Sequence, residues 1–269
     1  MDSVLDQRYV DLEYVAVDGG STDGSDALIA GYAARLAWWV SERDQGQYEA
    51  INKGFAHTTG EVMSWLNSDD LYLPWTLAVV GELFATFPEI EWMTSSYPLI
   101  WNEHGQPIAC NYRPGFSRAG FQRGEYLPTG TSYTTGYLQQ ESTFWRRSLW
   151  ERVGGSLDTS YRVAADFDLW MRFSKEAELY AVDVPLAGYR VHGNQRTAAE
   201  RPDYEREAEL SFARRGGRRY GRAESLAMRG IVAHLPVTAR RWATGAGLLS
   251  RRPACVNGGP GVGWQIVER

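Results

Sequence analysis

Short apolar runs that alternate with helical patterns constrain this sequence most strongly. Residues 13–18 are nearly all apolar, as expected of a strand buried on both faces. Further strands are expected at 36–40 and 62–66, and the spacing of apolar residues predicts helices over 25–35, 48–55 and 77–87. This alternation predicts an α/β fold with a mostly parallel sheet flanked by helices.

The pattern loosens after residue 91. We expect a hairpin with loops over 95–138, a helix that ends at 153 and another over 165–175. For residues 199–269 we expect a helical or irregular, partly disordered tail that follows a domain of residues 1–198.

Carboxylates follow each of the first three predicted strands. Asp18 ends the first, Glu42 and Asp44 follow the second, and Asp69 and Asp70 follow the third. Ligands of open α/β sheets bind beyond the carboxyl ends of the strands. We therefore expect five carboxylates along one edge of a single sheet, where they would meet a cation or many hydroxyls.

Composition and charge narrow the class of protein. With 43% hydrophobic and 23% charged residues among 269, the chain is neither disordered nor a disulfide scaffold. Its two cysteines, Cys110 and Cys255, cannot form a structural zinc site alone. No apolar run reaches the roughly 18 residues of a membrane span, and no signal peptide opens the chain. These features predict a soluble, cytoplasmic protein without a nucleic-acid partner.

The charge is distributed unevenly. Residues 201–269 hold 13 Arg and 6 acids, a balance of +7, which leaves −12 for the first 200 residues and −5 in total. The basic cluster consists of Arg214, Arg215, Arg218, Arg219 and Arg222. It suggests peripheral contact with anionic lipid, and the alternative is a solvated extension.

Two loops offer ligand-binding chemistry. Asp69 and Asp70 are hard oxygen ligands suited to Mg²⁺ or Mn²⁺, although such a pair also starts turns and helices. In the loop of residues 18–24, Gly19 lets backbone N–H groups approach a ligand, and Ser21 is placed to cap a helix. Neither a Walker loop nor a dinucleotide fingerprint is present.

Residues 165–172 contain two acids of different expected roles. Asp166 and Asp168 point to nearly opposite faces of a helix. Asp168 precedes Arg172 by four residues, which favours a structural ion pair. Asp166 is then a candidate general base, or alternatively a helix cap. Further on, His192 is a candidate metal ligand, with a plain surface or core histidine as the alternative.

Six motifs in a fixed order resemble those of family 2 glycosyltransferases. They are SVLDQ (3–7), VDGGSTDG (17–24), SERDQG (41–46), AINKGF (50–55), LNSDD (66–70) and DFDLW (166–170). The resemblance covers roughly residues 1–198. It implies a GT-A fold, a single Rossmann-like nucleotide-sugar-binding domain, a Mn²⁺ or Mg²⁺ cofactor, and inversion at the anomeric carbon.

The resemblance also implies residue roles. Asp70 would bind the metal that bridges the diphosphate, with His192 as a further ligand, and Asp69 would contact the metal and the donor ribose or sugar. Asp166 matches the catalytic base. The other candidate donor-binding residues are Asp18, Gly19, Ser21, Glu42, Asp44, Asn52 and Lys53.

The resulting expectation is a metal-dependent inverting transferase that uses a UDP-, GDP- or dTDP-sugar in cell-wall or polysaccharide biosynthesis. Its acceptor would be a glycan, a lipid-linked sugar or a small molecule, and the missing Gln-x-x-Arg-Trp signature favours single addition. Family members usually begin with an apolar strand before SVLDQ, so we expect the GT-A domain to lack its first strand. The alternatives are a non-catalytic nucleotide-sugar-binding remnant and, ranked last, a sugar nucleotidyltransferase.

Overall fold

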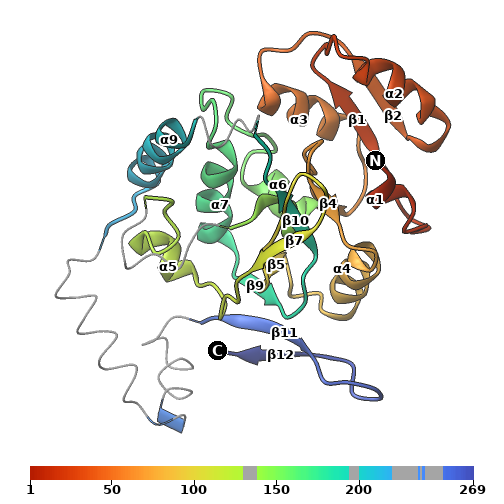
Figure 1. Cartoon of the computed structure of the whole chain (residues 1–269). Coiled ribbons are helices and arrows are strands. Elements are labelled where there is room, and N and C mark those ends of the chain that lie inside the picture. The colour runs from red at the N-terminus through yellow and green to blue at the C-terminus, as the bar shows by residue number, and fades with distance from the viewer. Residues whose placement is uncertain (130–137, 194–199, 220–235, 237, 240–250) are drawn as a thin grey trace.

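Three sheets and the helices around them make up the part of the chain that the computed structural model describes (Figure 1). The described residues are 1–129, 138–193, 200–219, 236, 238–239 and 251–269.

The N-terminal unit is built around a two-stranded parallel sheet. Its elements are α1 (Asp2–Leu5), β1 (Val15–Asp18), α2 (Ser25–Gly31), the 3-10 helix η1 (Ala33–Arg35), β2 (Trp38–Ser41) and α3 (Gln47–Ala56). α3 packs closely on this sheet. The approach is close at Gly54, where a Cβ would lie 3.2 Å from the Val17 side chain. Since β1 and β2 run in parallel, the loops after both strands leave from the same edge.

A six-stranded sheet with the order β12-β11-β9-β5-β8-β3 forms the centre. Its strands are β3 (Val62–Met63), β5 (Trp92–Ser95), β8 (Thr143–Arg146), β9 (Leu179–Val182), β11 (Pro253–Asn257) and β12 (Trp264–Glu268). Successive residues alternate between two cores, as the pleat requires. Trp92 and Trp145 belong to one core, whereas Met93 and Phe144 belong to the other.

Helices cover both faces of this sheet (Figure 1). The face of Trp92 is covered by α5 (Arg118–Arg123), α6 (Arg147–Arg152), α7 (Ala165–Glu176) and α9 (Arg201–Arg214), and the opposite face by α4 (Thr76–Thr86). The Trp170 ring of α7 lies 5.9 Å from Trp92 and 5.7 Å from Trp145, measured between ring centroids. These three rings are almost fully buried, so α7 is anchored in the densest part of the core.

A four-stranded sheet with the order β4-β10-β6-β7 lies beside the candidate site. Its strands are β4 (Leu71–Tyr72), β6 (Leu99–Trp101), β7 (Pro107–Cys110) and β10 (Ala187–Arg190). β6 and β7 form the hairpin predicted within 95–138. β10 runs antiparallel to β4, which brings the residues after β10 next to the turn before β4.

The α/β class with flanking helices is confirmed, but the sheets are more mixed than expected. Four strand pairs are parallel and five antiparallel among the described residues. The expectation of five carboxylates along one sheet is wrong. Asp18, Glu42 and Asp44 follow the two-stranded sheet, whereas Asp69 and Asp70 lead into β4 of another. The reason is that β3 stops at Met63 and the chain leaves that sheet before the acids.

Two segments differ from their expected secondary structure. Residues 143–146 form β8 instead of the start of a helix, because a short apolar run is compatible with either structure. In the C-terminal tail α9 is helical as expected, but residues 253–268 form a hairpin whose strand β11 pairs in parallel with β9. The end of the described chain thus extends the central sheet. Among the described helices none is long and apolar enough to cross a membrane.

Candidate donor and catalytic site

The turn of residues 67–70 holds Asp70 in a buried position. Asp70 is only 3% exposed. Its Oδ1 accepts a hydrogen bond from the backbone N–H of Arg190 in β10 at 3.0 Å. Its Oδ2 accepts one from the Asn67 side chain at 3.3 Å. The antiparallel pairing of β4 with β10 therefore fixes this carboxylate.

Asp69 is the more accessible of the two adjacent acids. Its side chain is 37% exposed, and its Oδ2 lies 3.2 Å from Nε2 of His192, whose side chain is 28% exposed. The Arg190 side chain donates from Nε to the backbone carbonyl of Asp69 at 2.8 Å. The structure thus brings Asp69, Asp70 and His192 together, although His192 is 123 positions from Asp69.

Glu141 is a third acidic residue at this place, after Asp69 and Asp70, and sequence reasoning missed it. It belongs to the 3-10 helix η2 (Gln140–Ser142) and is 3% exposed. Burial raises the pKa of Glu141 well above its usual range, and the nearby charge of Asp70 adds to the effect. Burial likewise raises the pKa of Asp70 to about 7, with a contribution from Asp69. No motif marks Glu141, because its burial depends on contacts far along the chain.

A chain of side-chain amides connects α3 with the acidic cluster, which consists of Asp69, Asp70, Glu141 and His192. Gln47, at the N-terminus of α3, donates from Nε2 to Oδ1 of Asn67 at 2.6 Å. Asn67 in turn donates from Nδ2 to Oε1 of Gln140 at 3.4 Å. Gln140 completes the series with a bond from Nε2 to the Trp65 carbonyl at 2.6 Å. The N-terminal unit and the central sheet are therefore joined at the acidic cluster.

The acidic cluster suits a divalent cation in its chemistry. Carboxylate oxygens and a neutral imidazole are donors that Mn²⁺ and Mg²⁺ accept. The raised pKa of Asp70 reflects a carboxyl that is poorly compensated when ionised, and a divalent cation would supply the missing positive charge. Within the described ranges, no three His, Cys, Asp or Glu side chains stand in the spacing of a metal site. Asp69 and His192 offer the more accessible donors.

Asp166 lies in the first turn of α7. Its Oδ2 accepts a hydrogen bond from the Tyr204 hydroxyl at 3.1 Å. Its Oδ1 is shielded from solvent and has no hydrogen-bond partner among the described residues. Burial raises the pKa of Asp166 to about 6, against the lowering effect of the Phe167 N–H and the Tyr204 hydroxyl. One oxygen is thus held by Tyr204, and the other is buried without a partner among the described residues.

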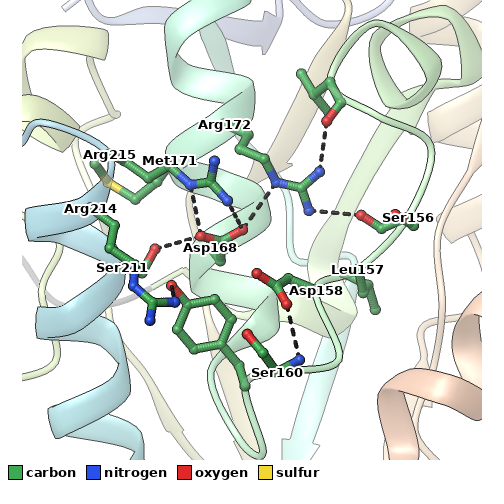
Figure 2. Close-up of polar contacts among 12 residues, drawn as sticks. Ser156, Leu157, Asp158, Ser160, Asp168, Met171, Arg172, Ser211, Arg214 and Arg215 are labelled. Atoms are coloured by element: carbon green, nitrogen blue, oxygen red, sulfur yellow. Dashed lines mark hydrogen bonds and ion pairs between the residues drawn. The ribbon is translucent and has the colours of Figure 1, made fainter.

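Asp168 plays the structural role that its spacing predicts. It is fully buried, and its Oδ2 accepts from Nε of Arg172 at 3.0 Å, so the predicted ion pair is confirmed. Figure 2 shows that Ser211 and Arg215 of the α9 region also bind this carboxylate.

The loop after β1 is held by Asp18. This carboxylate accepts bonds from the N–H groups of Gly20 and Ser21 and from the hydroxyls of Ser21 and Ser41, at 2.5 to 3.2 Å. The two hydroxyls hold the pKa of Asp18 below its usual value. A Cβ at Gly19 would lie 2.6 Å from Oδ2 of Asp44, so the glycine permits the approach of the two loops.

The remaining candidate donor residues lie on the N-terminal side. Lys53 of α3 donates to Glu42 at 2.6 Å. Asp44 accepts a bond from the backbone N–H of Gly46 at 2.9 Å. The Asn52 amide bonds both the N–H and the carbonyl of Leu157, at 2.7 and 2.9 Å. In this structure Asn52 therefore holds the loop that leads to α7.

A pocket of about 460 Å³ lies between the N-terminus of α3 and the loop before α7. Its lining residues are 45–49 and 159–162. Gln47 both lines this pocket and bonds Asn67 of the acidic cluster. The pocket therefore adjoins the cluster on one side and the approach to α7 on the other.

Several arginines of the basic cluster contact other side chains of the protein. Arg214 lies over the Tyr161 ring, Arg215 pairs with Asp168, and Arg219 pairs with Glu209. Fewer of these charges are left for a lipid surface than the sequence suggests. Arg222 lies outside the described residues.

A family model described as Glycosyl transferase family 2 matches residues 1–139, just over half of the chain. The chain therefore belongs to glycosyl transferase family 2. Asp166 and His192 lie beyond the matched residues.

Two relatives extend the similarity. An uncharacterised glycosyltransferase of Nostoc sp. is 29% identical over 212 residues, which are 77% of this chain and 65% of that protein. A PGL/p-HBAD biosynthesis glycosyltransferase of Mycobacterium bovis is 30% identical over 200 residues, which are 72% of this chain and 71% of the relative. The chain thus spans slightly less than two thirds of the Nostoc protein.

Solved structures support the GT-A fold. A fragment of S. aureus TarS in complex with UDP-GlcNAc has a TM-score of 0.55 at 15% identity, over 79% of this chain and 60% of that one. The same fragment with UDP has a TM-score of 0.51 at 17% identity, over 87% of this chain and 70% of that one. At these identities the likeness shows the fold alone.

Proposed function

We propose that this chain transfers one sugar at a time from a nucleotide-sugar donor to an acceptor hydroxyl, with inversion and with a divalent metal. The observation that carries the proposal is the carboxyl of Asp166, whose Oδ1 is shielded and unpaired among the described residues while burial raises its pKa to about 6. A carboxylate with such a pKa is mostly ionised at neutral pH and is still basic enough to accept a proton.

In the proposed step the acceptor oxygen attacks the anomeric carbon while its proton passes to Asp166. The bond between that oxygen and the anomeric carbon forms as the bond to the leaving phosphate oxygen breaks. The nucleoside diphosphate leaves with the electron pair. A single displacement inverts the configuration and needs no covalent enzyme intermediate.

The acidic cluster would bind the diphosphate side of the donor. Asp69, Asp70 and His192 do not stand in metal-site spacing in this structure, so they would have to draw closer to hold Mn²⁺ or Mg²⁺. The ion supplies Lewis-acid neutralisation of the leaving diphosphate when bound. Asp69 would also contact the donor ribose or sugar. The loops after β1 and β2 would hold the nucleotide through Asp18, Gly19, Ser21, Glu42 and Asp44, together with Asn52 and Lys53 of α3. The pocket between the N-terminus of α3 and the loop before α7 would leave room for the donor sugar.

The donor class is a UDP-, GDP- or dTDP-sugar. TarS, the structural neighbour, is described with UDP-GlcNAc and UDP, so uridine nucleotides are the first to test. The M. bovis relative is named for PGL/p-HBAD biosynthesis, and we propose a glycan, lipid-linked or small-molecule acceptor for this chain. A place in cell-wall or polysaccharide biosynthesis in the cytoplasm is consistent with these substrates.

Calorimetric titration tests the donor half of the proposal. UDP, GDP and dTDP are each titrated with and without Mn²⁺, and we expect metal-dependent binding of one of them. Asp70→Asn should weaken that binding about a hundredfold. Glu103→Gln removes an exposed acid outside the site and should leave the binding unchanged. If none of the three nucleotides binds with metal, the donor site is not functional and the proposal fails.

A further inference from the structure

α9 lies beyond the residues that the family model matches, yet it contacts α7 through polar groups along its length. Tyr204, Glu207 and Ser211 of α9 each hydrogen-bond the α7 region, and Arg215 follows at its C-terminal end. These positions are three to four residues apart, so they line one face of the helix.

Glu207 fixes the start of α7. Its carboxylate accepts hydrogen bonds from three successive backbone N–H groups, those of Arg162, Val163 and Ala164, at 2.9 to 3.1 Å. The N–H groups near a helix start have no partner within the helix, and α7 has no side-chain cap of its own. A glutamate from another helix therefore supplies the missing acceptor and fixes the backbone just before Asp166.

Tyr204 fixes the side chain of Asp166 itself. Its hydroxyl donates to Oδ2 at 3.1 Å, while Oδ1 keeps no partner among the described residues. A carboxylate held through one oxygen has a defined rotamer, and its unpaired oxygen keeps the capacity to accept a proton. Tyr204 lies three residues before Glu207, so both contacts come from one turn of α9.

The far end of α9 is held by Asp168. Figure 2 shows this carboxylate between two guanidinium groups, with Ser211 beside it. Ser211 donates to Oδ1 at 2.8 Å, and Arg215 donates to both oxygens at 2.9 Å. Because Asp168 is fully buried, this network prevents α9 from rotating or sliding along α7. The contacts of Tyr204 and Glu207 with the start of α7 are thereby kept in register.

We propose that α9 is the positioning element for the general base, in which Glu207 fixes the backbone that leads into the first turn of α7 and Tyr204 fixes the rotamer of Asp166. This inference rests on the proposed function, because it assumes that Asp166 is the base. Tyr204 and Glu207 act through Asp166 and are positioning residues.

The two contacts act on the ionisation of Asp166 in opposite directions. The Tyr204 hydroxyl bonds the carboxylate and lowers the pKa of Asp166, whereas the negative charge of Glu207 raises it. Glu141 of η2 is a further acid whose charge interacts with Asp166. Removal of the hydroxyl and removal of the Glu207 charge should therefore move the pKa in opposite senses, which a loss of packing alone would not do.

The test is a titration of Asp166 by ¹³C NMR in the chain of residues 1–269, labelled at aspartate carboxyls. The Asp166 resonance is assigned by its loss in Asp166→Asn. In Tyr204→Phe we expect the pKa of Asp166 to rise by about one pH unit, because one bond to a charged group is lost. In Glu207→Gln, which keeps an acceptor for the α7 amides, the pKa should fall.

Ser211→Ala is the matched control, since it removes another hydrogen bond between α9 and α7 without contacting Asp166. It should lower the melting temperature and leave the Asp166 titration unchanged, because the two bonds of Arg215 to Asp168 still hold the register of α9. The proposal is overturned if Tyr204→Phe titrates like the wild type, or if Ser211→Ala moves the titration as much as Tyr204→Phe. This readout needs no substrate, so it separates the role of α9 from the donor-binding test above.

Turnover gives a second readout once the donor is known. Tyr204→Phe should lower kcat about tenfold and leave the donor KM unchanged, because base positioning and donor binding are separate. An unchanged kcat would contradict the positioning role even if the pKa moves.

Discussion

Asp18 and Asp166 are carboxylates in two regions that treat their acids differently. Asp18, in the loop after β1, accepts four hydrogen bonds from neighbouring residues, and its pKa lies below the usual value. Asp166, at the start of α7, has one side-chain donor and a raised pKa. A satisfied carboxylate shapes a loop, whereas an under-satisfied one remains available for chemistry. This difference is why we propose a binding role for the first region and proton transfer for the second.

The two regions also differ in how they are packed. α2 of the N-terminal unit has no buried residue, and Leu28 is 58% exposed. Eight of the twelve residues of α7 are buried. The proposed base thus lies on a helix packed into the core, and the proposed nucleotide loops lie beside the lightly packed α2. Variants of α7 should therefore affect stability and proton transfer, whereas variants of the loop after β1 should affect nucleotide binding.

The largest loss of stability is expected from Asp168→Asn. Removal of the charge leaves Arg172 and Arg215 facing each other without their common partner. Breaking a buried ion pair by removing one member costs about 3–5 kcal/mol, and the lower end applies because Arg215 is 32% exposed. Urea unfolding should show this loss. Glu205→Gln breaks an exposed ion pair with Arg201 within α9. It should change the free energy of unfolding by less than about 1 kcal/mol.

A smaller effect concerns the pH dependence of transfer. The base must be ionised, and burial raises the pKa of Asp166 to about 6. The rate should therefore be flat above this pH and fall about tenfold for each pH unit below it. A profile of kcat between pH 4.5 and 8.5 measures the acidic limb. A limb centred near pH 4 would mean that an ordinary exposed carboxylate acts as the base.

The smallest effect is expected in the β1 region. Ser21→Ala removes one of the four bonds to Asp18, so the pKa of Asp18 should rise and stability should fall by about 1 kcal/mol. Nucleotide affinity should weaken only a few-fold, as measured by calorimetry, because the other three bonds keep the loop in place. Thr22→Ala is the neighbouring control. A complete loss of binding in Ser21→Ala would show that the hydroxyl contacts the nucleotide directly.

Local sequence patterns predicted the parts of this structure that depend on residues close together in the chain. The i, i+4 spacing predicted the ion pair of Asp168 with Arg172, and the apolar periodicity predicted α3, α4 and α7. The pairing of β10 with β4 joins segments more than a hundred residues apart, and it alone brings His192 to Asp69. No local signal contains that information.

The same limit explains the residues that sequence reasoning missed. Glu141 becomes a buried acid only when η2 packs beside the turn of Asp70, and Tyr204 reaches Asp166 across 38 positions. The pairing of β11 with β9 likewise joins distant segments. In each case the free energy comes from tertiary packing, which overrides the weak preference of a short segment.

The most direct test of the central claim measures nucleotide binding and transfer on the same preparation of Asp166→Asn. Transfer is followed as nucleoside diphosphate release from the selected sugar nucleotide, with a panel of glycoside and lipid-linked acceptors. Loss of a general base costs about 10²–10⁴-fold in rate. We predict a loss of this size with metal-dependent nucleotide binding unchanged. Transfer at the wild-type rate would contradict the account, because another group would then take the acceptor proton.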